Sequence, residues 1–458
     1  MGLTKVMQDY SIVLISLAGL GFVGPFFRFG PYYESYAKKG QSDLMQLYLI
    51  IVHAGMLLVV VLSYLFEDTI KGYFGVRSPL FSVFYYWTLV YAYLFLLFGV
   101  FEMYLFSKGE AVFQSFTREI IVRIIIFLLL MAVLLGLQVQ YFITLFSIHY
   151  LIPLLLLIWY AWRKYPFALG VPWSKISKRL LPHMSRMAGI GIMQTIIYAG
   201  VPVVDTLVVG GMVGLEGVAT YLLMNYISTL VYVPVRATSS VLGAKVSSYW
   251  KENEIDKIQV VYQRSSMSYL IFAVFMVSLI LFNMDLFQRL IGKNITLSLS
   301  VVLPLVLAKI FELSTGLSNL IIGYSKKWKI ESAISIGNVL IAIPLNIYMV
   351  GRYGITGAAI STLILAFLTF STRILVLYKI YRLFPFRFRT LGFLLFGATL
   401  FILFYMLCGT ASGILVKMVL SAIYAVFFMV VIVWFRFSED INIVFENLVK
   451  RFGKYRRP

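Results

Sequence analysis

Charged side chains inside long apolar segments are the residues of this sequence best placed to do chemistry. The apolar segments 186–213 and 217–244 contain Asp205 and Arg236. Each segment is long enough to cross a bilayer, where a charge costs about 3 kcal/mol or more unless it is paired or faces a water-filled cavity. Two such charges on neighbouring helices predict a polar path through the membrane. A mutually neutralised structural pair is the alternative.

Two arginines follow prolines at corresponding places in the chain. Pro25 precedes Arg28, and Pro234 precedes Arg236. A proline in a helix frees backbone carbonyl groups, and a guanidinium group binds phosphate through two parallel hydrogen bonds. We therefore expect both arginines to line a cleft and to suit a ligand that carries phosphate. Arginines that extend towards cytoplasmic phospholipid head groups are the alternative.

Further polar residues lie inside the apolar segments. Lys309 and Glu312 are three residues apart, so they can neutralise each other on one helix face, and Lys309 is a third candidate cation for substrate binding. Asn338 and Asn346 share a face and can bind sugar hydroxyls or join helices. Three arginines lie near cytoplasmic segment ends, where extension to the interface is expected. The candidates for the polar cleft or for ion coupling are Asp205, Glu102, Glu312, Asn338 and Asn346, and the three arginines are Arg118, Arg123 and Arg373.

The composition indicates an all-α polytopic membrane protein. Hydrophobic residues make up 61% and charged residues 13%, against about 45–50% and 25% in soluble domains. The net charge is +20, but the basic residues fall in short loops, which is typical of membrane topology and not of nucleic-acid binding. Cys408 is the only cysteine and the three histidines have no helical partner, so no disulfide, metal site or cofactor is predicted.

Windows of about 19 residues predict thirteen transmembrane segments. No gap between them is long enough for a folded soluble domain. The longest gap, 163–185, predicts an interfacial helix. The segments are 11–27, 44–66, 80–106, 117–137, 140–162, 186–213, 217–244, 266–284, 298–323, 328–350, 355–381, 390–409 and 413–435.

An internal repeat predicts two homologous helical bundles around a central cleft. Phe106-Ser-Lys108 recurs as Tyr324-Ser-Lys326, an offset of 218 residues (324 − 106). Repeats of this kind are typical of transporters. Segment 186–213 then has no partner in the first half, which predicts that a first helix is missing before Met1. The expected domains are an N-terminal bundle (1–167), a linker helix (168–185), a second bundle (186–386), and two extra helices with a basic tail (387–458).

Alternate loops differ strongly in lysine and arginine content, and the basic set includes the C-terminal tail from Arg436 to Arg457. Because positively charged loops remain in the cytoplasm, we expect a cytoplasmic C-terminus.

Two short motif blocks resemble a known family. The first is Pro202-Val-Val-Asp205-Thr-Leu-Val-Val-Gly210 with Gly214-Leu-Glu216-Gly217, and the second is Tyr353-Gly-Ile-Thr-Gly357-Ala-Ala-Ile-Ser361-Thr362. Together they are similar to bacterial polysaccharide (O-antigen) flippases, the Wzx-like branch of the multidrug/oligosaccharidyl-lipid/polysaccharide (MOP) exporter superfamily.

The resemblance implies a MOP/MATE-like fold in the bacterial cytoplasmic (inner) membrane. It also implies alternating-access transport of an undecaprenyl-diphosphate-linked oligosaccharide for surface polysaccharide or lipopolysaccharide biosynthesis. The expected partners are this lipid-linked substrate and membrane lipids, and the protein is expected to be a monomer. Transport is driven either by a proton or sodium ion that binds at Asp205 or by the substrate gradient itself.

Two other functions are weighed against the flippase. A multidrug cation antiporter needs acidic residues in its cleft, and Asp205 and Glu102 are outnumbered by arginine and lysine. A membrane-embedded glycan polymerase or ligase usually needs a long external loop, and no outward loop exceeds roughly 15 residues. The sequence therefore favours a transporter that is not an enzyme.

Overall fold

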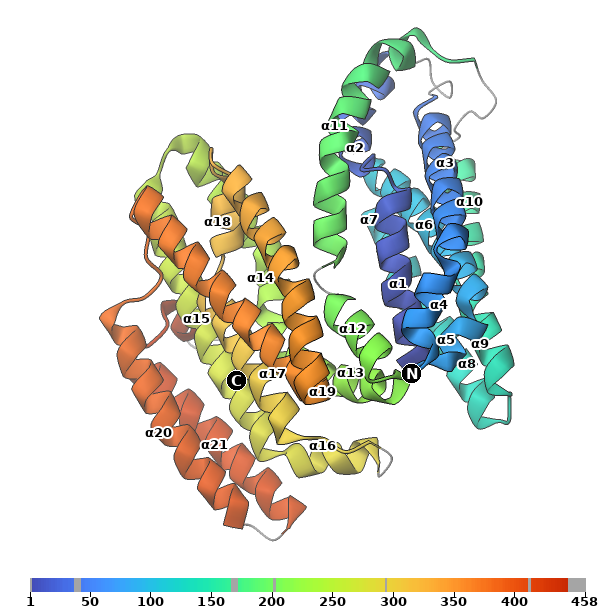
Figure 1. Ribbon diagram of the computed structural model, residues 1–458. Helices are drawn as coiled ribbons and strands as arrows, with labels where there is room; N and C mark the ends of the chain where they lie inside the picture. The colour runs from blue at the N-terminus through green and yellow to red at the C-terminus, as the bar shows by residue number, and fades with distance from the viewer. Residues whose placement is uncertain are drawn as a thin grey trace, which may run out of the picture. The chain divides into compact units, whose positions relative to one another are not determined.

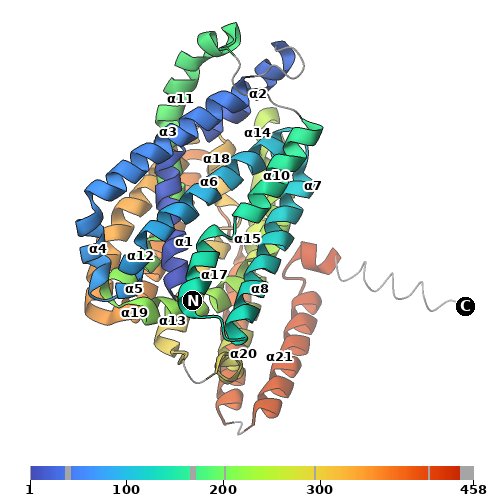
Figure 2. The same ribbon diagram turned by 90° about the vertical axis from the view of Figure 1, so that its right-hand side faces the viewer.

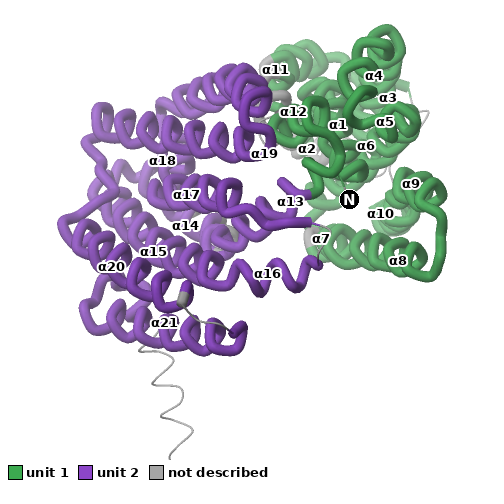
Figure 3. The backbone as a smooth tube through the Cα atoms, turned by 60° about the horizontal axis from the view of Figure 1, so that its bottom comes forward, with its two compact units in different colours: residues 1–219 green, residues 220–458 purple. Residues whose placement is uncertain are grey.

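The computed structural model describes residues 2–36, 43–165, 172–200, 203–292, 295–410 and 413–443, which form helices joined by turns (Figure 1). A segment in lipid must satisfy its backbone N–H and C=O groups within itself, and a helix does so. The chain divides into two compact units, residues 1–219 and 220–458 (Figure 3).

Unit 1 begins with two helices separated by a bend and ends with two more. Its helices are α1 (Gly2–Ala18), α2 (Val23–Tyr36), α3 (Leu44–Leu65), α4 (Glu67–Gly75), α5 (Pro79–Val83), α6 (Tyr85–Ser107), α7 (Ala111–Phe116), the π-helix η1 (Thr117–Ile121), α8 (Val122–Leu134), α9 (Val139–Ile148), α10 (Leu151–Lys164), α11 (Lys175–Gly200) and α12 (Val204–Met212).

Unit 2 contains the remaining helices, of which α13 begins just before the unit boundary. They are α13 (Leu215–Thr229), the 3-10 helix η3 (Leu230–Tyr232), α14 (Val233–Glu252), α15 (Ile255–Phe282), α16 (Met284–Ile291), α17 (Leu299–Ser314), α18 (Ser318–Tyr324), α19 (Lys329–Tyr381), α20 (Phe388–Thr410) and α21 (Ile414–Trp434).

Eight helical segments of the described chain are long and apolar enough to cross a membrane, or ten if each bent pair counts as one span. This confirms the all-α, polytopic membrane protein expected from the composition. The number of candidate spans differs from the thirteen predicted segments because breaks between helices interrupt several of the apolar stretches. One bent pair is α1 with α2, at 60°, and the other is α17 with α18, at 44°.

α19 consists of two helices joined at Gly354, where φ is +58° and ψ is −137°. A Cβ atom on Gly357 would lie 2.0 Å from the carbonyl oxygen of Met349, so the helices approach as closely as glycine allows. The turn lies between the predicted segments 328–350 and 355–381, which are therefore distinct helices within this one element.

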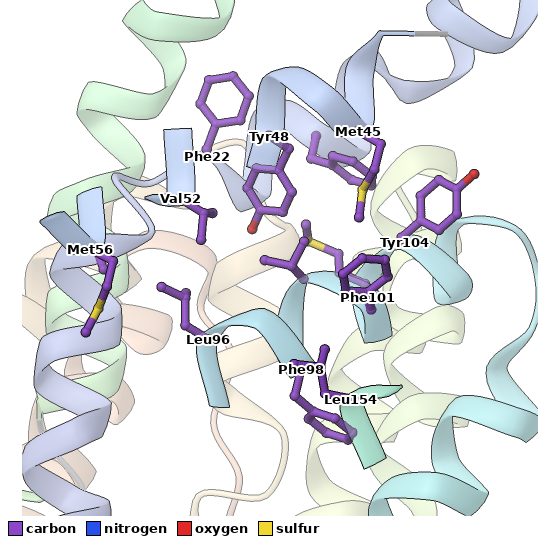
Figure 4. Packing of buried hydrophobic residues seen from close by; sticks show 14 of the residues in the cluster. Phe22, Met45, Tyr48, Val52, Met56, Leu96, Phe98, Phe101, Tyr104 and Leu154 are labelled. Carbon is purple, nitrogen blue, oxygen red and sulfur yellow. The ribbon is translucent and has the colours of Figure 1, made fainter. Parts of the chain in front are cut away.

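The core of unit 1 is rich in aromatic side chains. The ring of Tyr48 on α3 stacks on Phe22 at 5.9 Å between centroids and lies 5.1 Å from Phe26. α6 contributes Phe98 and Phe101 to the same buried cluster, as Figure 4 shows. Lipid is itself apolar, so these rings stabilise the packed state through close contact, about 0.5–1.5 kcal/mol for each aromatic pair, and they anchor α3 and α6 to the first helix pair.

The core of unit 2 joins α15 to the two C-terminal helices. α20 and α21 lie side by side as a hairpin that contacts α15 (Figure 2). Phe282 of α15 stacks on Phe401 of α20 at 5.6 Å and meets Tyr424 of α21 edge to face at 5.0 Å. The hairpin therefore packs on α15 through aromatic rings.

Segment 186–213 differs from its sequence-based assignment. α11 and α12 contact α1, and α11 also contacts α2, so they belong to unit 1 and the unit boundary lies after Ala219 rather than near residue 186. α11 begins at Lys175 and continues through Pro182 to Gly200, so no separate linker helix precedes it within the described residues 172–185. The missing first helix, which was predicted because this segment had no partner in the first half, stays a prediction.

Glycine decides how α11 packs. Gly21, in the bend between α1 and α2, has a φ of +65°, and a Cβ atom there would lie 2.2 Å from the carbonyl oxygen of Ala188 and 2.3 Å from the amide nitrogen of Ile192. The bend and the α11 backbone therefore touch directly. No residue other than glycine can occupy this position without moving α11.

Gly21→Ala is expected to lower the stability of unit 1 by about 2–3 kcal/mol, because the added Cβ overlaps the α11 backbone at a left-handed position. Gly109→Ala is the matched control: its φ is +81°, but nothing lies within 4 Å of the added atom. Thermal unfolding of the purified protein in detergent measures both. Equal losses for the two variants would contradict direct backbone packing at Gly21.

Candidate functional site

A buried carboxylate in unit 1 was missed by the sequence analysis. Asp9 on α1 is 0% exposed, and its Oδ1 atom accepts a hydrogen bond from Lys5 Nζ at 2.6 Å. Its Oδ2 atom has no hydrogen-bond partner in the described part of the chain. The predicted first segment began at residue 11, whereas α1 begins at Gly2. A longer window at the N-terminus would have placed Asp9 inside the span.

Asp205 lies next to this carboxylate. It stands in the first turn of α12, a helix that contacts α1, and both Asp205 and Thr206 interact electrostatically with Asp9. Thr206 is buried and Asp205 is partly buried. Unit 1 therefore gathers two carboxylates, one hydroxyl group and one ammonium group at the α1 and α12 contact. Two carboxylates beside one lysine carry a net negative charge, which favours a proton or another cation.

A second polar cluster lies at a cavity in unit 1. Glu102 on α6 is 5% exposed, and its Oε1 atom accepts a hydrogen bond from Gln114 Nε2 at 3.1 Å. Arg118 Nη1 lies 3.6 Å from Glu102 Oε2. Arg118 therefore pairs with a buried carboxylate, whereas the sequence favoured its extension to the membrane interface.

The π-helix η1 places this arginine. A π-turn adds a residue to the helix and rotates the side chains that follow it, and such turns are frequent at functional sites. Thr117 Oγ1 donates to the Phe113 carbonyl at 2.9 Å and satisfies one group of the wide turn. The cavity, of about 380 Å³, is lined by Glu102, Gln114 and Arg118 together with Gly21, Tyr48 and Thr195. The polar cluster thus opens onto the bend between α1 and α2.

Glu110 fixes the helices beside this cavity. Its carboxylate accepts hydrogen bonds from Lys164 Nζ at 2.5 Å, Tyr165 Oη at 2.6 Å and Tyr160 Oη at 2.9 Å. These bonds, that from Lys164 most strongly, lower the pKa of Glu110 from 4.5 to about 2. The carboxylate is therefore ionised at neutral pH. It joins α10 to the start of α7, the helix that carries Gln114.

Three of the polar residues predicted for the site in unit 2 contact other side chains of the same unit. Lys309 Nζ lies 3.3 Å from Glu312 Oε2, as the three-residue spacing predicted, and 5.2 Å from the centre of the Tyr232 ring. Asn338 Nδ2 donates to Thr369 Oγ1 at 2.8 Å and so joins the two helices of α19. Asn346, also on α19, is completely buried.

A further ion pair in unit 2 accounts for Arg373. Its guanidinium group donates two hydrogen bonds to the buried carboxylate of Glu331, which lies in the first helix of α19. The sequence favoured extension of Arg373 to the interface. The structure pairs it instead, because the turn at Gly354 brings Glu331 beside it.

The two arginines predicted to bind phosphate belong to different units. Arg28 lies on α2 in unit 1, and its side chain is exposed. Arg236 lies on α14 in unit 2, and its side chain is outside the part of the chain that the structure describes. Within that described part, no group of three His, Cys, Asp or Glu residues could hold a metal ion.

Comparison with known proteins places the fold. No protein-family model and no curated protein sequence matches the chain. Among solved structures, it is similar to the lipid II flippase MurJ in its inward closed conformation, with a TM-score of 0.65 and 17% identity over 94% of this chain and 97% of that one.

Two further solved structures share the arrangement. The MATE transporter VcmN of Vibrio cholerae in the bent form has a TM-score of 0.52 and 15% identity, over 82% of this chain and 88% of that one. A mutant of the same transporter, in which one aspartate is replaced by asparagine, also scores 0.52, with 14% identity over 83% and 86%. Both kinds of neighbour are members of the MOP superfamily. The chain shares the fold of these lipid II flippase and MATE transporter structures.

Lys5→Met is expected to destabilise the protein by about 3 kcal/mol, because it leaves the carboxylate of Asp9 buried without its cation. The double variant Lys5→Met/Asp9→Asn is expected to recover most of the loss. Thermal unfolding of the purified variants in detergent measures the coupling energy between Lys5 and Asp9. A double variant that loses as much as the sum of the single variants would show that Lys5 and Asp9 act independently.

Proposed function

We propose that this protein is a flippase that carries an undecaprenyl-diphosphate-linked oligosaccharide across the bacterial cytoplasmic membrane, for surface polysaccharide biosynthesis. The observation that carries the proposal is the likeness to a lipid II flippase over 94% of this chain and 97% of that one. The MATE structures match over 82% and 83% of this chain. The motif blocks at Pro202 and Tyr353 support the same function.

Arg28 and Arg236 are the candidate cations for the diphosphate in this mechanism. Arg28 and Arg236 offer planar guanidinium groups, which match phosphate oxygens in pairs and stay charged when partly dehydrated. Lys309 is the third cation, but it shares its charge with Glu312 and the Tyr232 ring, so it holds an anion less strongly than an arginine does. Alternating access then exposes the bound head group first to the cytoplasmic side and afterwards to the opposite side.

The glycan has polar partners in unit 1. Glu102, Gln114 and Arg118 present planar hydrogen-bonding groups at one cavity, and Tyr48 adds an aromatic face beside them. Such groups bind adjacent sugar hydroxyls, while an aromatic ring covers the less polar face of a sugar. In unit 2, the buried Asn346 remains a candidate polar contact, whereas the hydrogen bond of Asn338 to Thr369 supports a role in joining helices.

Replacement of Arg28 or Arg236 is expected to lower transport in the order Arg, then Lys, then Ala, because lysine keeps the charge and loses the paired hydrogen bonds. Complementation of glycan export in a flippase-deficient bacterium measures transport, with membrane abundance measured in parallel. An arginine that only extends to the interface would be replaced by lysine without loss.

Arg123→Ala is the matched control, because Arg123 is an exposed arginine whose ion pair with Glu119 lies within one helical stretch. It is expected to leave export unchanged. Full export by both the Arg28→Ala and the Arg236→Ala variants at normal abundance would remove these residues from the site.

A multidrug cation antiporter is the second candidate, and one observation favours it. Unit 1 holds the buried carboxylate of Asp9 beside Asp205, which gives the acidic site that an antiporter needs and that the sequence analysis did not find. The same pair serves a flippase that is driven by a proton or sodium gradient. Substrate therefore decides between the two functions: glycan export supports the flippase, and cation efflux without glycan export supports the antiporter.

Asp205→Asn is expected to abolish the dependence of transport on an imposed proton or sodium gradient, because the amide removes the charge that a cation binds. Proteoliposomes with a fluorescent lipid-linked oligosaccharide and defined gradients measure it. Asp285→Asn, which changes an exposed aspartate paired with Lys417, is the control. A gradient response that survives in Asp205→Asn would place ion coupling elsewhere.

A further inference from the structure

A cavity with basic side chains in its wall lies within unit 2, and none of the groups assigned to transport lines it. It has a volume of about 380 Å³ and lies between α14, α15 and the segment that follows α21. Lys245 on α14 and Lys257 and Arg264 on α15 line it. Lys245 and Lys257 belong to the loops that the distribution of positive charge predicts to be cytoplasmic, and Arg264 follows Lys257 on the same helix. This prediction puts the cavity at the level of the inner-leaflet head groups.

The three cations differ in how far they are already neutralised. Lys257 Nζ lies 2.6 Å from Glu254 Oε1, and Arg264 pairs with Glu439. Among the described residues, Lys245 has no carboxylate within ion-pair distance, and its side chain is exposed. Lys245 can therefore bind an incoming anion without breaking an existing pair. Lys257 and Arg264 retain donors that can turn towards the same anion.

Apolar side chains form another part of the wall. Leu242, Val260 and Val261 line the same cavity, and Val260 is 38% exposed. A soluble phosphate ester gains nothing from an apolar wall, whereas the glycerol and first acyl carbons of a phospholipid do. Basic pockets between membrane helices on the cytoplasmic side are typical binding sites for anionic lipid head groups.

Two carboxylates limit how strongly the cavity attracts an anion. Asp256 on α15 and Asp440, which follows α21, both line it. Asp440 is held there by its neighbours: Ser268 Oγ lies 2.9 Å from Ser438 Oγ and 3.4 Å from Asp440 Oδ2. The segment after α21 thus places a negative charge in the wall of a basic cavity.

We propose that this cavity binds the phosphate group of an anionic phospholipid of the inner leaflet, with Lys245 as the principal cation, and that Asp440 weakens the binding by repulsion. The ligand chemistry is a phosphate diester on an apolar glycerol backbone. Neither the transport cations nor the glycan cavity takes part, so the proposal stands independently of the transported substrate.

Native mass spectrometry of the full chain in detergent, titrated with phosphatidylglycerol, tests the site. Lys245→Gln is expected to weaken binding about fivefold, the effect of one basic residue near a membrane surface. Lys251→Gln, an exposed lysine on the same helix that does not line the cavity, is expected to have no effect. Equal binding by these two variants would overturn the site, and a thermal unfolding curve shows whether each variant is folded.

Asp440→Asn gives a change of opposite sign. Removal of the repelling charge is expected to tighten phosphatidylglycerol binding several-fold, whereas a merely structural role of Asp440 predicts equal or weaker binding. Phosphatidylcholine and glycerol 3-phosphate separate the possible ligands. Binding of phosphatidylcholine as tight as that of phosphatidylglycerol would overturn anion recognition. Displacement of the lipid by glycerol 3-phosphate at equal concentration would overturn the assignment to a lipid.

Discussion

The need to satisfy backbone polar groups in lipid is the constraint on which this structure depends. A membrane helix can break only where protein covers the freed groups, because an unsatisfied amide in hydrocarbon costs several kcal/mol. At the bend between α1 and α2, Gly21 lies against the α11 backbone. At the bend between α17 and α18, Gly316 has a φ of +54°, and Ser266 of α15 donates to the carbonyl of Ser314. Each break is thus covered by a helix of its own unit.

These breaks also determine where cavities and polar residues are tolerated. The glycan cavity proposed for unit 1 opens beside Gly21, and the π-turn that carries Arg118 forms its far wall. Continuous helices would fill this space with side chains. Because a bend removes a turn of regular packing, polar groups such as Glu102 and Gln114 gain room for each other and for a ligand.

Buried charges follow one rule in both units. Asp9 forms an ion pair with Lys5, Glu102 forms one with Arg118, and Glu331 forms one with Arg373. Burial of a neutral ion pair in lipid requires less free energy than burial of a single charge. Removal of either partner leaves the other charge buried without compensation, which is strongly destabilising. Such pairs can therefore respond to a substrate or ion that brings its own charge. The fold is shared by a lipid II flippase and a MATE transporter, so the fold alone does not determine the substrate.

The sequence by itself determined the class of the protein, because apolar length and charge exclusion from lipid act locally along the chain. The excess of apolar residues predicted a helical membrane protein, the spacing of Lys309 and Glu312 predicted their pairing, and the glycine-rich motif at Gly354 coincides with a sharp turn.

Only the tertiary structure decided which helices belong together and which charges meet. Segment 186–213 belongs to unit 1 because the α11 backbone touches Gly21, a contact between residues far apart in the sequence. Glu102 meets Arg118, which lies in the π-helix η1, across 16 residues of sequence (118 − 102). Asp9 falls inside a candidate span because α1 begins at Gly2, earlier than the apolar window did. Hydropathy reports how each segment interacts with lipid, whereas these outcomes depend on how helices interact with one another.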